Sequence, residues 1–207
     1  MITQTERLAL RRFTAEDLPL LVELDSDPAV MRYLTGGKPT PAETVRREVL
    51  PAILRDYLRF PDFGKWAATE RASGAFVGWF ALKPVGTGTA AVGTRSLPLP
   101  VVEVELGYRL RRAYWGRGYG SEGARELLRL AFAQPTVERV FAQTMAVNIA
   151  SRRVMEAVGM RLARCLHLQW DDPIDGTEHG EVEYEMRRAD WPAALRATRP
   201  LDPPRQA

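Results

Sequence analysis

The sequence predicts an α/β fold: one domain with a mixed, mostly antiparallel twisted sheet of about six to seven strands and helices on both faces. Two observations support this class. Patterns follow one another as strand, helices, two strands, then strand, helix, strand, helix and two closing strands. The chain also has 207 residues and 45% hydrophobic content, enough for one well-filled core, without an internal repeat or a linker. The domain is expected to cover residues 1–191, with 192–207 as a partly disordered C-terminal tail.

The N-terminal half contains the patterns of a strand, three helices and a hairpin. Alternating apolar residues predict a strand over residues 7–13. Capping residues followed by helical periodicity predict helices over 14–24, 27–34 and 40–58. Pro51 lies inside the third of these patterns, where it should kink or split the helix. A change to period two then predicts a hairpin of two strands, over 65–70 and 75–82.

The connection from Pro84 to Pro100 is rich in Gly and Thr, and Arg95 is its single charged residue. A structureless connection of this length is uncommon inside a compact domain. We therefore expect it to be either mobile or a functional flap.

The stretch from Val102 to Leu130 organises the second half of the chain. Polar and apolar residues alternate over 103–110, as on a half-buried strand, and three glycines then occur within residues 116–120. A helical stripe begins directly after this turn. A glycine-rich turn at a helix N-terminus presents unpaired N–H groups and the positive end of the helix dipole, so it suits a phosphate or pyrophosphate. A tight turn without a ligand is the alternative.

A second strand-to-helix unit follows the first. Alternation predicts a strand over 140–145, and Asn148 stands at the N-cap of a helix over 149–158. Closing strands are expected over 161–170 and 180–187. These elements complete the mixed sheet.

Three motifs carry a resemblance to a known family. They are E-L-G-Y-R-L at 105–110, Y-W-G-R-G-Y-G at 114–120 and N-x-x-S-x-x-x-x-x-x-x-G-M at 148–160. In this order and spacing they resemble the GNAT N-acetyltransferase superfamily, and the glycine loop is similar to the RimJ/RimL-like branch of ribosomal-protein N-terminal acetyltransferases. The similarity extends from Glu6 to about Trp191. It implies a GNAT-like fold and direct transfer of an acetyl group to an amine from acetyl-CoA as the cosubstrate.

The resemblance assigns the glycine loop to the pyrophosphate of acetyl-CoA, with the arginines at 111, 112 or 117 assisting. It places the pantetheine arm along a strand edge near Leu110, whose N–H would polarise the thioester carbonyl. Asn148 and Ser151 have a competing explanation as cap and first-turn residues, but the family pattern implies contact with the CoA arm. The expected cofactor-binding residues are Leu110, Arg112, Trp115, Gly116, Arg117, Gly118, Tyr119, Gly120, Ser121, Asn148 and Ser151.

Glu105 is the expected general base, because it lies on the polar face of its strand and matches the glutamate of the family motif. An α-ammonium with a pKa of about 8 must lose a proton before it can attack. Glu103 shares that face and is the reserve, and either carboxylate could instead be merely solvated or bind the substrate ammonium. Ser151 is the second catalytic candidate, because many family members carry a tyrosine acid four residues later, where this chain has Met155. The general acid is left open between Ser151, a water and none, while Tyr108 is expected in the core.

Composition argues against several other classes of protein. The net charge is only +3 and most arginines are interspersed with acids, so a nucleic-acid-binding face is not indicated. No run of eighteen apolar residues exists, so no membrane span is expected. Cys165 is alone, which suits a reducing cytoplasm and a small buried side chain, and His167 and His179 are too isolated for a metal site. We expect a cytoplasmic monomer or homodimer without a metal.

The sequence therefore predicts an acetyl-CoA-dependent N-acetyltransferase that acts on a primary amine, either a protein N-terminus or a small molecule. The alternative is a non-catalytic, regulatory CoA-binding module, which Met155 favours and Glu105 disfavours. Charges in the expected helices are nearly balanced, which favours an acceptor with one ammonium and an uncharged body over a polycation. The helices from Asp17 to Tyr57 and the 84–100 connection are expected to shape the acceptor site.

Overall fold

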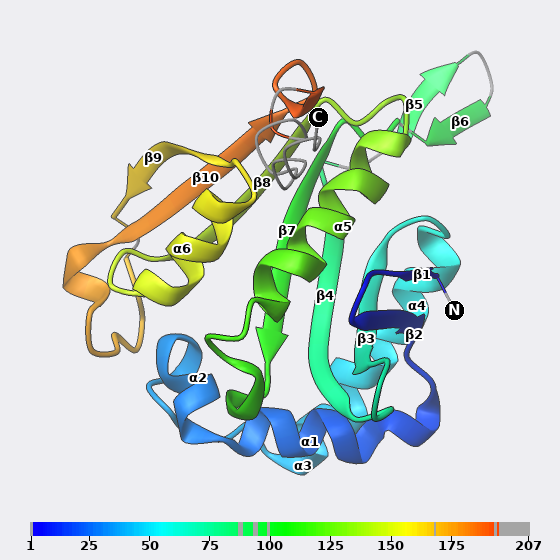
Figure 1. The fold of residues 1–207 in the computed structure, drawn as a ribbon. Helices are drawn as coiled ribbons and strands as arrows, with labels where there is room; N and C mark the ends of the chain where they lie inside the picture. The colour runs from blue at the N-terminus through cyan, green and yellow to red at the C-terminus, as the bar shows by residue number, and fades with distance from the viewer. Residues whose placement is uncertain are drawn as a thin grey trace, which may run out of the picture.

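The centre of the molecule is an eight-stranded sheet with the order β1-β2-β3-β4-β7-β8-β10-β9 (Figure 1). The structure is a computed structural model and describes residues 2–86, 89–92, 95–98, 100–167, 169–192 and 194, with the backbone alone at 89–92 and 95–98. The strands of the sheet are β1 (Thr3–Gln4), β2 (Leu8–Arg12), β3 (Gly64–Glu70), β4 (Phe76–Val85), β7 (Glu103–Leu110), β8 (Arg139–Met145), β9 (Arg161–Leu166) and β10 (Glu181–Arg187). Neighbouring strands are antiparallel except β7 and β8, which are parallel. The predicted mixed, mostly antiparallel sheet is confirmed.

The predicted helices are present as well. They are α1 (Leu18–Ser26), α2 (Pro28–Thr35), α3 (Ala42–Thr44), α4 (Leu50–Arg59), α5 (Tyr119–Ala133) and α6 (Ile149–Ala157). Between α3 and α4 the helix widens into a π-turn, Val45–Val49, in which the N–H of Leu50 donates to the carbonyl of Val45. The wider turn lies directly ahead of Pro51, whose ring would clash with the carbonyl of a regular α-turn. Pro51 therefore alters the helix without breaking it.

Apolar side chains form a core on each face of the sheet. On one face α5 and α6 pack against the central strands (Figure 1), and Phe80, Leu106 and Leu127 are buried there. On the other face α1 and α4 pack near β3, with Leu21 and Ala67 in the second cluster. Helices on both faces are therefore confirmed. Among the described residues, no helix combines the length and the apolar character that a membrane span requires.

Two edges of the sheet differ from the expectations. The sheet has eight strands rather than six to seven, because the two-residue β1 is too short to show a period in the sequence yet pairs with β2. At the other edge β9 ends at Leu166, and its residues before Leu166 are exposed because no further strand or helix covers them. Cys165 is consequently exposed rather than buried.

The 84–100 connection contains β5 (Thr89–Val92) and β6 (Arg95–Pro98), which form a separate two-stranded hairpin. Figure 1 shows this hairpin projecting from the end of the sheet opposite to α1 and α2. Of the helices that we expected to shape the acceptor site together with this connection, α1 and α2 lie at the other end of the sheet (Figure 1), whereas α4 leads to the start of β3, which pairs with the last part of β4. Residues 87–88, 93–94 and 99, and all of the expected tail except 192 and 194, lie outside the described residues.

Candidate active site

β7 and β8 are parallel neighbours that pair only at their beginnings. The described pairs are Glu103–Arg139, Val104–Val140 and Glu105–Phe141. β7 then continues to Leu110 and β8 to Met145, and Figure 1 shows the two strands separating toward the end of the sheet where α2 lies. We call the region between residues 106–110 and 142–145 the strand divergence. It lies where the chain leaves β7 for the glycine loop and leaves β8 for α6.

Some peptide groups of β7 face the strand divergence and do not pair with a neighbouring strand of the described chain. Arg111 donates its N–H to the carbonyl of Val77 on β4 (2.9 Å), whereas the carbonyl of Val102 accepts from the start of β8. Peptide groups alternate in direction along a strand, so the odd-numbered residues of β7 point to β4 and the even-numbered ones to β8. The peptide of Tyr108 and the N–H of Leu110 therefore face the divergence, beyond the last pair that joins β7 and β8 in the described chain.

Leu110 and Trp115 together form one border of this edge. The carbonyl of Leu110 accepts a hydrogen bond from the indole Nε1 of Trp115 (2.8 Å), and the Trp115 residue is nevertheless 45% exposed. The indole is thus anchored at its nitrogen while its apolar ring stays accessible. An extended chain of amides could pair with the free edge as an added strand would. The geometry suits the expected pantetheine contacts of both residues, which remain predictions.

The glycine loop offers a row of free donors at the start of α5. Gly118 has a φ of 82° and is the N-cap of the helix, a conformation that glycine adopts without strain. Within the described chain, none of the backbone N–H groups of residues 116–121 donates a hydrogen bond to another residue. Consecutive free N–H groups and the positive end of a helix dipole form a site for an anion such as pyrophosphate.

Arg7, on the turn between β1 and β2, holds this loop in place. Its Nη1 donates to the carbonyl of Arg117 (2.9 Å) and its Nε to the carboxylate of Glu122 (2.6 Å). Its guanidinium also lies 4.3 Å from the centre of the Tyr119 ring. The Tyr119 side chain is buried and its hydroxyl donates to Glu70, so only the backbone of Tyr119 is free for a ligand. Sequence patterns gave no signal for Arg7, which lies 115 positions before Glu122.

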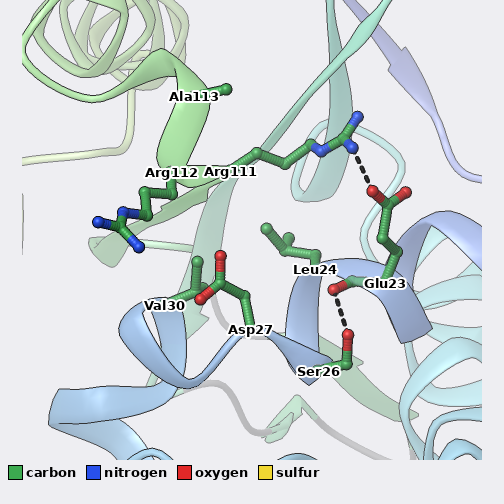
Figure 2. Close-up of a pocket in the computed structure, with 8 residues that line it drawn as sticks. All are labelled: Glu23, Leu24, Ser26, Asp27, Val30, Arg111, Arg112 and Ala113. Atoms are coloured by element: carbon green, nitrogen blue, oxygen red, sulfur yellow. Dashed lines mark hydrogen bonds and ion pairs between the residues drawn. The ribbon is translucent and has the colours of Figure 1, made fainter.

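The arginines beside the loop do not form one phosphate-binding cluster. Arg111 pairs with Glu23 of α1, and Figure 2 shows Arg111 and Arg112 pointing in opposite directions. Arg112 lines a cavity of about 300 Å³ between α1, α2 and the end of β7, with Asp27 across from it. Arg117 lies on the loop, with its guanidinium 5.5 Å from the Tyr119 ring centre. Of the three, Arg117 is the one positioned beside the free N–H groups.

Glu105 lies on the face of β7 opposite to α5. Its Oε2 is 3.8 Å from Nζ of Lys83, and its side chain is 36% exposed. The reserve candidate, Glu103, instead pairs with Arg139, which also binds Glu183 and Glu185. The two carboxylates are similarly exposed, at 35% for Glu103 and 36% for Glu105, so they differ in their partners: Glu103 is held in an ion cluster, whereas Glu105 has the longer contact with Lys83.

Tyr108 makes a contact that the sequence did not predict. Its hydroxyl lies 3.0 Å from both the carbonyl oxygen and Oγ of Ser151, so it joins β7 to the first turn of α6 across the divergence. Burial raises the pKa of Tyr108 to about 12, although the hydrogen bond with Ser151 acts in the other direction. The Tyr108 ring packs against the core as expected, and its centre lies 6.2 Å from that of Phe80, while its hydroxyl reaches Ser151. Met155, by contrast, is 1% exposed and belongs to the core.

Asn148 has both ends of its amide occupied in the described chain. Its Oδ1 accepts from the N–H of Ser151 (3.3 Å), and its Nδ2 donates to Oγ1 of Thr144 (3.0 Å). It is thus the N-cap of α6. Contact of Asn148 or Ser121 with the cofactor remains a prediction. No group of three or more potential metal ligands occurs within the part of the chain that the structure describes.

Comparison with known proteins identifies the family. A family model described as the acetyltransferase (GNAT) domain matches residues 7–161. The chain belongs to the GNAT acetyltransferase family. This GNAT chain is 35% identical over 188 residues to the FsC-acetyl coenzyme A-N(2)-transacetylase of Aspergillus fumigatus, covering 90% of this chain and 76% of that protein. It is also 28% identical to the uncharacterized protein YkkB of Bacillus subtilis, covering 82% of this chain and 90% of that one.

Solved structures show the same GNAT fold. RimL, a ribosomal L7/L12 α-N-protein acetyltransferase in complex with coenzyme A, has a TM-score of 0.69 at 17% identity, over 90% of this chain and 97% of that one. The aminoglycoside acetyltransferase AAC(6')-Ib in complex with coenzyme A has a TM-score of 0.66 at 19% identity, over 93% and 99% of the two chains. At these identities the likeness is one of fold. The family makes this chain an acyltransferase.

Proposed function

We propose that this acyltransferase uses acetyl-CoA and transfers its acetyl group directly to a primary amine. The observation that carries the proposal is the strand divergence. The free N–H groups of the glycine loop lie at its end, and the carboxylate of Glu105 lies on the face of the sheet away from α5. This arrangement gives a phosphorylated thioester and an amine separate approaches to one point on β7.

The residues around the divergence fit acetyl-CoA. The N–H groups of residues 116–121 would hold the pyrophosphate, and the free edge at Tyr108 and Leu110 would take the amides of the pantetheine arm. Trp115 and Ile149 are large apolar residues that are 45% and 46% exposed on the loop and at the start of α6. They offer apolar surface to the arm. When bound, acetyl-CoA supplies an acyl group activated as a thioester.

Glu105 is the base in this proposal. Its side chain is accessible on the face away from α5 and lies beside the divergence, so an amine that approaches from that face meets the carboxylate. An ammonium of pKa about 8 loses its proton to such a group directly or through one water. The N–H of Leu110, which faces the divergence, can donate to an oxyanion that forms there.

Tyr108 stabilises the departing sulfur by donating a hydrogen bond. A phenol with a pKa of about 12 stays protonated at neutral pH. Complete transfer of its proton to a thiolate, whose pKa is about 8.5, is unfavourable by roughly 3–4 pKa units. Hydrogen bonding, rather than full protonation, is therefore the role that its pKa allows. In the structure the phenol donates its single proton to the Ser151 carbonyl, and its oxygen also lies 3.0 Å from Oγ of Ser151. To donate to the sulfur the hydroxyl must turn away from that carbonyl, and Ser151 Oγ can then donate to the phenol oxygen and hold it in place.

For the acceptor we propose a small amine or a peptide N-terminus. The name of the Aspergillus relative describes N(2)-acetylation of FsC, and that of RimL describes acetylation of a ribosomal protein. The near balance of acids and arginines along the N-terminal helices supports a singly charged amine over a polycation.

An assay of CoA release tests the proposal. A panel of primary amines and short peptides is incubated with the protein and acetyl-CoA, and binding of CoA is measured separately by calorimetry. CoA release that depends on an amine supports the enzyme. Tight CoA binding without release for any amine would support the non-catalytic module instead.

A further inference from the structure

A row of residues crosses three strands on the face of the sheet that carries Glu105. Lys65 of β3 lies opposite Ala81 of β4, and Ala81 lies opposite Gly107 of β7. Directly paired residues project to the same side of a sheet, and Gly107 comes two positions after Glu105, so the row shares the face of the expected base. It leads from the strand divergence to Lys65, two strands away.

The middle of this row consists of residues with small side chains and is accessible. Ala81 and Gly107 are only half-buried although they belong to central strands, and a Cβ added to Gly107 would lie 3.5 Å from the Trp79 ring. Larger side chains flank the row on either side, namely Trp79, Arg109, Lys83 and Glu105. A molecule that lies on Ala81 and Gly107 would therefore extend from Glu105 toward Lys65.

Lys65 carries an ammonium group without an oxygen partner. Its Nζ lies 4.1 Å from the centre of a Trp79 ring, and no acceptor among the described residues binds it by a hydrogen bond or an ion pair. The guanidinium carbon of Arg109 lies 5.3 Å from a Trp79 ring centre as well, but Arg109 is paired with Asp25. Burial, followed by the charge of Arg109, lowers the pKa of Lys65 to about 8, while Asp25 and Asp56 act against that shift. A desolvated cation without a counter-ion is costly unless an anion arrives with a ligand.

We propose that Lys65 binds a carboxylate of the acceptor, so that the acceptor is a primary amine with one carboxylate at its far end. This inference rests on the acetyl transfer proposed above. Neighbouring strands are about 4.8 Å apart, so the amine at β7 and the carboxylate at Lys65 are separated by roughly 5–10 Å. Two extended residues span about 7 Å, so a short peptide with a free C-terminus has the required length. The charge balance of the helices had suggested an acceptor with an uncharged body. Lys65 changes this expectation to an acceptor whose body carries one carboxylate.

A matched pair of acceptors isolates this contact. Alanylalanine and its C-terminal amide differ by one negative charge, and kcat/KM for both is measured with the wild-type protein, Lys65→Met and Lys38→Met. Lys38 is exposed and pairs with Asp172, so Lys38→Met controls for the loss of one lysine charge. The wild-type protein and Lys38→Met should prefer the carboxylate form by roughly 10–100-fold, the usual worth of a hydrogen bond to a charged group. Lys65→Met should treat the two acceptors alike.

A second measurement needs no substitution. In the wild-type protein the preference should decline as the pH rises through about 8, because Lys65 then loses its charge among Arg109, Asp25, Asp56 and Lys83. Equal kcat/KM for the two acceptors in the wild-type protein, or a preference that persists in a folded Lys65→Met variant, overturns the proposal.

Calorimetry separates this inference from the function on which it rests. Binding of alanylalanine and of its amide, in the presence of CoA, is compared between the wild-type protein and Lys65→Met. If the wild-type protein acetylates no amine, the proposed function fails. The loss of the carboxylate preference in Lys65→Met would still support the role of Lys65, and its persistence would still overturn it.

Discussion

Glu105 and Tyr108 lie on opposite faces of β7, and we propose a different role in the reaction for each. Their surroundings give them different chemistry. Glu105 is partly exposed with Lys83 as its nearest cation, so it is accessible to a proton from an amine. Burial raises the pKa of Tyr108 to about 12, so its hydroxyl donates hydrogen bonds and keeps its proton. In the proposed reaction, this strand would supply the carboxylate that takes the proton of the amine and the hydroxyl that donates to the departing sulfur.

Replacement of Glu105 by Gln should lower kcat by on the order of 10²–10⁴-fold, the usual worth of a general base, because the amide cannot take a proton. The affinity for CoA should stay nearly unchanged, since Glu105 lies on the face away from the glycine loop. Steady-state kinetics and calorimetry measure the two effects. Full turnover of Glu105→Gln below pH 7, where an unassisted amine is mostly protonated, would place the base elsewhere.

Replacement of Tyr108 by Phe should lower kcat by about 3- to 10-fold, because it removes one hydrogen bond of ordinary strength. Ser151→Ala is the matched control, since it removes Oγ but leaves the Ser151 carbonyl as a partner for the phenol. The effect of Ser151→Ala should therefore be smaller. An unchanged kcat in Tyr108→Phe, with acetyl transfer as the rate-limiting step, would exclude the phenol from the reaction.

The residue scale also shows where sequence reasoning ends. Alternation along 103–110 predicts which residues share a face, and it correctly separates Glu105 from Tyr108. It cannot distinguish Glu105 from Glu103, because the partner of Glu103 is Arg139, which lies 36 positions away. It also missed the hydroxyl contact of Tyr108 with Ser151, which are 43 positions apart. Such pairings depend on the three-dimensional register of the strands.

At the scale of elements, the glycine loop is a defined turn that contacts a distant part of the chain. Positive φ at Gly116 and Gly118 directs the N–H groups, and Arg7 binds the turn to the β1–β2 connection. The turn and the helix after it follow from glycine spacing and helical periodicity, so both could be predicted locally. The contribution of Arg7 could not, because it comes from the far end of the chain.

Replacement of Gly118 by Val should weaken CoA binding by at least tenfold. A Cβ at this position would lie 3.2 Å from Nη2 of Arg7, and the φ of 82° disfavours a β-branched residue, so the turn must shift. Gly86→Val is the matched control, because Gly86 has a φ of 66° with nothing within 4 Å and follows β4 at the end of the sheet away from the glycine loop. Calorimetry should show normal CoA affinity for Gly86→Val. Unchanged affinity in a folded Gly118→Val variant would remove the loop from the cofactor site.

At the scale of the whole molecule, an ion cluster fixes the strands on the far side of the divergence. Arg139 of β8 binds Glu103 of β7 and both Glu183 and Glu185 of β10, and Arg164 of β9 also binds Glu183. The cluster ties together four strands at the end where β7 and β8 still pair. The sheet class and the helices on both faces were predictable from periodicity. The ion cluster that links β7, β8, β9 and β10 could not be predicted from the sequence, because it joins side chains from four separate segments.

Glu183 should make part of the stability depend on pH. Burial raises its pKa, but hydrogen bonds from Arg164, Gln143 and Arg139 outweigh burial and lower the pKa from 4.5 to about 2. A carboxylate with a lowered pKa stabilises the fold above its unfolded-state pKa, so this contribution should be lost as the pH falls from about 4.5 toward 2.

The free energy of unfolding in urea, measured from pH 6 to pH 3, tests this expectation. Glu183→Gln should be less stable at pH 6 and should lose less stability over the interval than the wild-type protein. Glu178→Gln, at a side chain that is 68% exposed, should follow the wild-type protein. The same pH dependence in all three proteins would show that the ion cluster does not titrate with the fold.

The central claim is that an amine attacks the thioester directly beside Glu105 at the strand divergence. A single-turnover experiment tests it most directly: the protein in excess over acetyl-CoA is mixed with alanylalanine, and intact-protein and small-molecule mass spectrometry follow the acetyl group over time. The dipeptide should gain one acetyl group as CoA is released, without an acetylated protein preceding it, and Glu105→Gln should slow this step. Acetyl-CoA that remains intact with every primary amine, although it binds, would contradict the account.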